Sequence, residues 1–150
     1  MNESKLYHLF FDVTLASKEA AFQFVGDSCE TSNICSSKID LIEQLNYRES
    51  VGNTLIAEHV LLPHVESPVL LTSKILFLRL LNPIQKWNDQ VNDISLIIVI
   101  LLKDAETLML KKSISRFVRK LADDEFVENL LAAETKVAFE VILKNIEEEK

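Results

Sequence analysis

The chain contains three histidines, and His64 is the one whose neighbours indicate chemistry. It directly follows Pro63, which stops the short apolar run of residues 59–62. Because proline fixes its own φ and cannot donate to a sheet ladder, we expect a strand to end here and to leave His64 at a sheet edge, facing solvent. An imidazole in that position is reachable by another protein. On spacing alone, a structural or merely exposed histidine stays an open alternative.

Arg48 is the second residue that indicates chemistry. Its guanidinium is a planar, permanently charged fork that suits phosphate oxygens. We expect it at the end of a helix over residues 37–48, before a loop over residues 49–57 that carries Gly52, one of only two glycines. If this loop folds back, Arg48 and His64 share a pocket.

The sequence gives little support for a metal site, a serine hydrolase site or a nucleotide site. His59 and His64 lie five residues apart, which turns them to opposite faces of a strand. Nothing fixes Glu58 or Glu66 beside them as further ligands, so we expect no metal. The G-x-S-x-G elbow of a serine hydrolase is absent. With two glycines the chain has neither a P-loop nor a dinucleotide-binding fingerprint, and no nucleotide cofactor is expected.

The composition is that of an ordinary globular protein, with 48% hydrophobic residues and a net charge of −7. Such a charge offers no surface that neutralises phosphates, so we expect no nucleic-acid partner. No secretory signal pattern is visible, and the most apolar segment, residues 94–102, is about half as long as a membrane helix. The spacing of Cys29 and Cys35 predicts free thiols in a reducing cytoplasm, with one disulfide as the alternative.

Two helices are predicted in the first third of the chain. Ser17 can cap a helix over residues 17–28, and Ser37 begins a capping arrangement for the helix over residues 37–48. Residues 6–13 are aromatic and aliphatic, which predicts a short strand or a turn that docks onto the core. These elements precede the candidate site.

The middle of the chain predicts a sheet. Two runs of β-branched and aliphatic residues, 74–81 and 94–102, read as strands, and the second has the character of a central strand. Between them Asn82-Pro83 and Asn88-Asp89 mark turns. Trp87 is expected to pack on the sheet edge.

The last third is predicted to be helical, over residues 104–121, 123–131 and 134–146, with Asp104 and Asp123 at the first two starts. Five basic side chains between residues 111 and 120 lie on the first of these helices. A solvated helix face explains them better than a surface that docks a partner. Helices, then strands, then helices indicate one layered α/β domain over residues 1–150.

One pattern around the candidate site resembles a known family. Arg48-Glu49, Thr54 and Glu58, followed by Val60-Leu61-Leu62-Pro63-His64, resemble the signature of the enzyme IIA domains of the mannitol/fructose class of the bacterial sugar phosphotransferase system. The resemblance covers nearly the whole chain and is slightly closer to galactitol-type members. Further matching segments are residues 75–80, 82–84, 94–102, 122–126 and 130–133.

The resemblance implies a mixed sheet of about five strands with helices packed on both faces, as in the mannitol-specific enzyme IIA. It also implies a phosphotransferase component in which His64 accepts a phosphoryl group from the phosphocarrier protein HPr and passes it to a cysteine of enzyme IIB, for uptake of a sugar or sugar alcohol. Arg48 would stabilise the phosphoryl oxygens. No cofactor is implied, and the membrane is involved only indirectly, through enzyme IIC.

Two departures from the family pattern affect this expectation. The second active-site histidine of the mannitol and fructose branches is missing from residues 104–112, as in galactitol-type members. The glycines of the bend are replaced, among others by His59, which could supply a second imidazole although strand parity argues against it. We expect Thr54, Glu58 and His59 around the site. The alternative function is that of the nitrogen-type relatives, regulation through phosphorylation-dependent partner binding.

Overall fold

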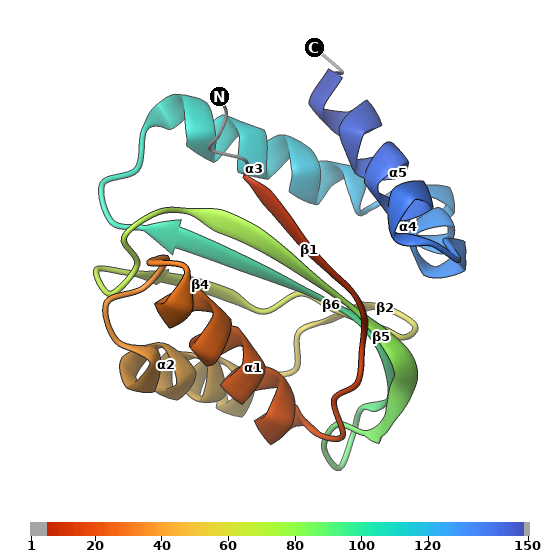
Figure 1. Cartoon of the computed structure of the whole chain (residues 1–150), viewed down its shortest axis with the longest axis horizontal. Coiled ribbons are helices and arrows are strands. Elements are labelled where there is room, and N and C mark those ends of the chain that lie inside the picture. Colours follow the sequence, from red (N-terminus) through yellow and green to blue (C-terminus); the bar gives the residue numbers. More distant parts are fainter. Residues whose placement is uncertain (1–5, 149–150) are drawn as a thin grey trace. The chain divides into compact units, whose positions relative to one another are not determined.

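The computed structural model describes residues 6–148, and its backbone divides into two compact units, Met1–Asp104 and Ala105–Lys150. Within the described part of the first unit, the helices are α1 (Lys18–Thr31) and α2 (Lys38–Ser50), and the strands are β1 (Tyr7–Val13), β2 (Leu55–Ala57), β3 (Val60–Leu61), β4 (His64–Ser67), β5 (Lys74–Lys86) and β6 (Asn92–Lys103). The second unit is helical, with α3 (Leu108–Lys120), α4 (Asp124–Ala132) and α5 (Lys136–Glu148) (Figure 1).

The strands form one mixed sheet in the order β1-β5-β6-β3-β2, and β4 also pairs with β6. β1 is parallel to β5, β5 is antiparallel to β6, and both β3 and β4 run parallel to β6. The predicted mixed sheet with helices is therefore confirmed, with six strands in the described residues where about five were expected. α1 and α2 lie side by side and cover one face of this sheet (Figure 1).

The strand before Pro63 ends, as expected: β3 stops at Leu61, and a separate strand, β4, begins at His64. Val60 pairs with Leu96 and His64 pairs with Ile100, so β3 and β4 share a single register along β6. Between them, the carbonyl oxygen of Pro63 accepts a hydrogen bond of 2.9 Å from the N–H of Ile100. Because proline lacks an N–H, the ladder is interrupted rather than terminated. His64 is therefore the first residue of β4.

The two long strands extend beyond their predicted bounds. The predicted turn at Asn82-Pro83 was wrong, because β5 continues through it to Lys86. A shift in register between Arg79 and Ile84 accommodates the proline. The turn at Asn88 is confirmed, since the side-chain oxygen of Asn88 accepts hydrogen bonds of 2.8 Å from the N–H groups of Gln90 and Val91.

The helix starts of the first unit agree with the sequence. The hydroxyl of Ser17 accepts from the N–H of Ala20 at 3.1 Å, and that of Ser37 accepts from the N–H of Asp40 at 3.2 Å, so both predicted caps are confirmed. α1 ends three residues later than predicted and α2 two residues later. At Gly26 an added Cβ would stand 2.7 Å from Cδ1 of Ile42, so this glycine allows α1 and α2 to approach closely.

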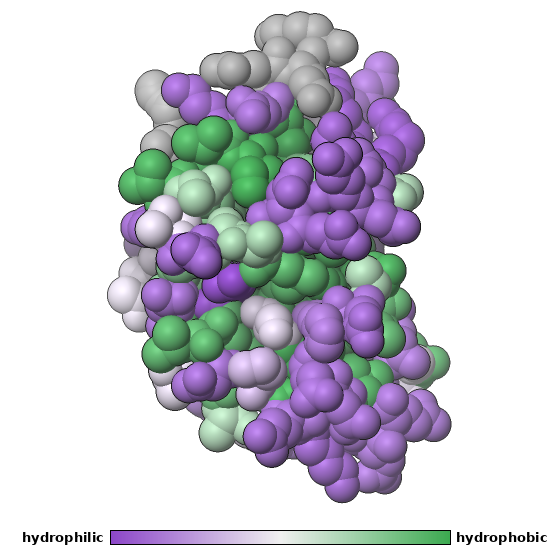
Figure 2. All heavy atoms as spheres, turned by 90° about the vertical axis from the view of Figure 1, so that its right-hand side faces the viewer, coloured by the Kyte–Doolittle hydropathy of each residue, from purple (hydrophilic) through white to green (hydrophobic). Residues whose placement is uncertain are grey.

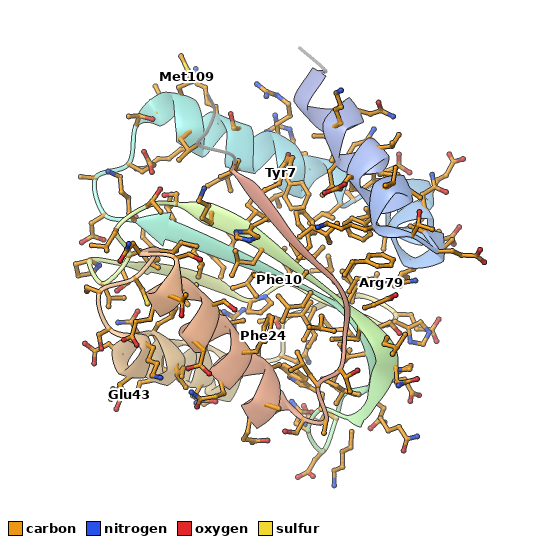
Figure 3. The ribbon with its side chains drawn as sticks, in the orientation of Figure 1. Tyr7, Phe10, Phe24, Glu43, Arg79 and Met109 are labelled. Carbon is orange, nitrogen blue, oxygen red and sulfur yellow. The ribbon has the colours of Figure 1, made fainter. Side chains whose placement is uncertain are left out.

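A hydrophobic core lies between the sheet and the two helices, with alternate residues of β5 and β6 contributing to it. Trp87 belongs to this core and is 4% exposed, so its expected place on the sheet edge was wrong. Its ring meets Phe22 edge-on at 5.6 Å between centroids. Phe10 of β1 and Phe24 of α1 point toward each other in the same edge-on manner, at 5.0 Å (Figure 3).

In the second unit the helix starts are again set by side-chain caps. Asp123 caps α4 by accepting from the N–H of Glu125 at 3.0 Å, as predicted, whereas α3 is capped by Thr107 and not by Asp104. The reason is that the chain turns at residues 104–105, so the capping residue lies three residues after the expected one. Within residues 6–148 no helix combines the length and apolarity needed to cross a bilayer.

Candidate functional site

Arg48 lies in the last turn of α2 and is half-buried. Its Nη1 donates a hydrogen bond of 3.1 Å to the carbonyl oxygen of Gly52, so the loop after the helix folds back over the guanidinium as expected. Gly52 has a φ of 156°, a backbone conformation that L-residues rarely adopt. Asn53 then accepts from the N–H of Leu55 at 3.1 Å and leads the chain into β2.

His64 is exposed at the start of β4, while its neighbours Pro63 and Val65 are buried. The surrounding protein still removes enough water from the imidazole to lower the pKa of His64 from its ordinary value. Glu66 raises this pKa and the positive charge of Arg48 lowers it, with the net shift downward. At neutral pH the imidazole is therefore uncharged, with a lone pair available for nucleophilic attack.

The structure thus brings Arg48 and His64 close enough to interact electrostatically, as the sequence led us to expect. α2, which carries Arg48 in its last turn, contacts β4, the strand that carries the histidine. A guanidinium beside a neutral imidazole can bind the oxygens of a phosphoryl group while the imidazole attacks the phosphorus.

Glu66 is a charged neighbour that sequence reasoning considered only as a metal ligand. It follows His64 by two residues in β4, and both side chains are exposed while Val65 and Ser67 are buried. Side chains two apart on a strand share a face, so the carboxylate can favour the protonated imidazole, in agreement with its effect on the pKa. The alternation of exposed and buried residues is the sequence signal that could have identified it.

Thr54 and Glu49 are buried together behind the loop, with exposed fractions of 5% and 8%. The Thr54 hydroxyl donates to Oε2 of Glu49 at 2.9 Å, and the indole N–H of Trp87 donates to Oε1 at 3.1 Å. The carbonyl oxygen of Thr54 accepts from the N–H of Leu62 at 2.9 Å. Thr54 therefore lies beside the site as a buried support, and the contribution of Glu49 and Trp87 was not foreseen.

Glu58 and His59 are placed in the turn between β2 and β3. Nδ1 of His59 lies 2.7 Å from the carbonyl oxygen of Asp93, and its own carbonyl oxygen accepts from the N–H of Ser95 at 2.9 Å. His64, in contrast, pairs with Ile100, five residues further along β6 than Ser95. At about 3.3 Å per residue, the backbones of the two histidines are separated by roughly 16 Å. The structure does not bring Glu58 and His59 to His64.

Both cysteines are free and buried, which confirms the predicted thiols. Burial raises the pKa of the Cys29 thiol to about 12 and also raises the pKa of Cys35. Neither thiol is a nucleophile at neutral pH. Among residues 6–148 no three His, Cys, Asp or Glu side chains come together in a way that could hold a metal ion.

The fold is that of the IIA components of the bacterial sugar phosphotransferase system. A structure of the nitrogen regulatory protein IIA-Ntr from Neisseria meningitidis superimposes with a TM-score of 0.73, at 23% identity over 92% of this chain and 94% of that one. The mannitol IIA of Escherichia coli, in its complex with phosphorylated enzyme IIB, gives a TM-score of 0.72 at 17% identity, over 93% and 99% of the two chains. At these identities the likeness shows the fold.

Residues 5–146 match the family described as "Phosphoenolpyruvate-dependent sugar phosphotransferase system, EIIA 2", and the chain therefore belongs to that family. It is a phosphotransferase component that takes part in phosphoryl transfer within this system, as the resemblance implied. A curated relative, the multiphosphoryl transfer protein 1 of Escherichia coli K12, is 29% identical over 129 residues. These residues are 86% of this chain and 15% of the relative, so the chain spans about a seventh of that protein's length.

Proposed function

We propose that the protein accepts a phosphoryl group on His64 from phosphorylated HPr and transfers it to a cysteine of its enzyme IIB, for uptake of a sugar or sugar alcohol. The observation that carries this proposal is the exposed imidazole of His64 at the start of β4, whose pKa is lowered by burial and by the positive charge of Arg48. His64 is the nucleophile, and Arg48 holds the phosphoryl oxygens. No metal or nucleotide is needed, because the donor already carries an activated phosphoryl group.

In the first step a ring nitrogen of His64 forms the new N–P bond while the N–P bond of the donor phosphohistidine breaks, and the bonding electron pair returns to the donor imidazole. In the second step the N–P bond on His64 breaks as a thiolate of enzyme IIB forms an S–P bond. Arg48 is positioned to compensate the charge of the phosphoryl oxygens in both steps. The neutral state of His64 supports the first step, since a protonated ring has a lone pair on neither nitrogen.

Exposed apolar side chains near Arg48 support a protein as the donor. Tyr47 is 70% exposed and Val51 is 61% exposed, and they lie four residues apart at the end of α2. Leu55 and Ile56 of β2 are also exposed, at 44% and 40%. Figure 2 shows a face of the molecule on which hydrophobic and hydrophilic side chains both reach the surface. Aromatic side chains are enriched at interfaces between proteins, so the exposed Tyr47 and its apolar neighbours suit a protein as the partner.

The partners are supported by the names of the similar proteins. The solved mannitol IIA is in complex with phosphorylated enzyme IIB, and the curated relatives are multiphosphoryl transfer proteins. We also propose that residues 1–150 act as one enzyme IIA domain. The family match supports this, because it runs across the boundary between the two compact units.

A second candidate function is regulation through phosphorylation-dependent binding. It is favoured by the structural likeness to the nitrogen regulatory protein IIA-Ntr. The same His64 chemistry would then set the affinity for a regulatory partner instead of feeding a transporter. Genes for enzymes IIB and IIC beside this one would favour transport, and their absence would favour regulation.

The test is incubation with phosphoenolpyruvate, enzyme I and HPr, followed by intact mass spectrometry of the wild type and His64→Ala. We expect an acid-labile gain of one phosphoryl group in the wild type and none in the variant. Adding enzyme IIB should then remove the group from the wild type. A folded wild-type protein that gains no mass would overturn the proposal.

A further inference from the structure

We propose that Glu49 and Trp87 are positioning residues, which tie Arg48 and His64 to the β5–β6 hairpin and so hold them in register for phosphoryl transfer. This inference rests on the phosphocarrier function proposed above. Neither residue is proposed to touch the phosphoryl group.

The first connection runs through the end of α2. Glu49 directly follows Arg48 and is 8% exposed. Its carboxylate accepts from the indole N–H of Trp87 at 3.1 Å, across 38 residues of sequence. The helix end that carries the guanidinium is therefore fastened to the hairpin by a side chain next to it in the chain.

The second connection runs from the same carboxylate to His64. The other oxygen of Glu49 accepts from the hydroxyl of Thr54 at 2.9 Å. The carbonyl oxygen of Thr54 in turn accepts from the N–H of Leu62, two residues before His64. One buried carboxylate thus links the residue beside Arg48 with the segment that leads into β4.

The hairpin provides a rigid anchor for both connections. Trp87 is 4% exposed and packs edge-on against Phe22 in the core. Its backbone N–H donates to the carbonyl oxygen of Val91 at 2.9 Å, which closes the turn between β5 and β6. The indole N–H therefore has a well-defined direction, and buried tryptophans usually find such a partner.

Loss of either donor would leave an oxygen of Glu49 buried without that hydrogen bond. A buried acceptor in this state is costly, so the carboxylate is expected to move toward water or toward another donor. The adjacent Arg48 would move with it. Small displacements of a group that orients a reaction cost large factors in rate, up to about 100-fold for about 1 Å.

The experiment compares Trp87→Phe and Thr54→Val with the wild type, because both variants remove a donor without changing the charge. The first readout is the pKa of His64, followed by NMR titration of its imidazole signals. Arg48 lowers this pKa, so Arg48→Ala should raise it, and both donor variants should raise it by part of that amount. In the double variant Arg48→Ala/Trp87→Phe, we expect no rise beyond that of Arg48→Ala alone.

The second readout is phosphorylation of His64 by phospho-HPr. At saturating donor we expect the rate to fall about tenfold in Trp87→Phe and Thr54→Val, with the KM for the donor changed by less than about twofold. Thr54→Ser keeps the hydroxyl and should restore both the rate and the pKa. Ile34→Val, a buried change in the core at a residue that makes none of these hydrogen bonds, should lower the unfolding midpoint without moving the pKa of His64.

The two proposals fail separately. If wild-type His64 gains no phosphoryl group, the phosphocarrier function is overturned. The positioning role is overturned if the donor variants leave the pKa of His64 unchanged, or if Arg48→Ala itself leaves it unchanged. It is also overturned if the pKa rises while the transfer rate stays at the wild-type value, because the placement would then not serve transfer.

Discussion

Arg48 closes the loop after α2 by donating a hydrogen bond of 3.1 Å from Nη1 to the carbonyl oxygen of Gly52. This bond is exposed, so its contribution to stability is small, at most about 1 kcal/mol. The hydrogen bond orients the guanidinium of Arg48, and the positive charge of the guanidinium lowers the pKa of His64. Replacing Arg48 should therefore affect phosphoryl transfer much more than the stability of the fold.

We predict that Arg48→Ala leaves the protein folded and slows phosphorylation of His64 by about 100- to 1,000-fold, the usual effect of removing a group that stabilises a transition-state charge. Rapid-quench intact mass spectrometry measures the rate, and thermal unfolding measures the stability. Lys86→Ala removes a cation that is 72% exposed and should serve as a control with the wild-type rate. Wild-type transfer by Arg48→Ala would exclude Arg48 from the site.

The pH dependence of transfer should follow the ionisation of His64. Its pKa is lowered, and only the neutral ring is a nucleophile, so the rate should persist on acidification past the ordinary value of 6.5 and fall only below it. Glu66→Gln removes a charge that raises this pKa. The acid limb of the rate profile should therefore move to lower pH in this variant.

Glu43→Gln provides the matched control for Glu66→Gln, since Glu43 is an exposed carboxylate on α2 (Figure 3). Its acid limb should coincide with that of the wild type. An acid limb that stays in place or moves to higher pH in Glu66→Gln would contradict the electrostatic role of Glu66.

Features of the fold that depend on neighbouring residues could be predicted from the sequence. The caps at Ser17, Ser37 and Asp123 are local, because each side chain bonds to an N–H two or three residues away. The pairing of Arg48 with His64 was expected if the loop after α2 folds back, and the local hydrogen bond from Arg48 to Gly52 shows that it does.

Features that depend on distant contacts could not be predicted. The hydrogen bond between Glu49 and Trp87 joins residues 38 apart in the sequence, and no local sequence pattern at either residue predicts it. The passage of β5 through Asn82-Pro83 depends on a register shift against β6, which the local turn signal cannot reveal. For the same reason, the local proline signal could not reveal that a second strand, β4, follows Pro63 and pairs with β6 in the same register as β3.

His59→Ala should transfer the phosphoryl group at the wild-type rate. Its imidazole lies against the carbonyl oxygen of Asp93, and its backbone is roughly 16 Å from that of His64 at about 3.3 Å per residue along β6. The measurement is the same rapid-quench rate at saturating phospho-HPr. A transfer rate that falls tenfold or more in His59→Ala would contradict this prediction and indicate that His59 is the second imidazole of the site.

The exposed end of α2 should govern recognition of the donor protein more than the chemistry. Tyr47 is 70% exposed one turn before Val51, and exposed tyrosines at interfaces often contribute more than about 1 kcal/mol to binding. Tyr47→Ala should therefore raise the KM for phospho-HPr by about fivefold or more, with little change in the rate at saturation. Ile39→Ala removes a side chain that is 66% exposed at the other end of the same helix and should leave the KM unchanged. Equal effects of the two variants, or a loss in the saturated rate alone, would show that the donor does not dock on this end of α2.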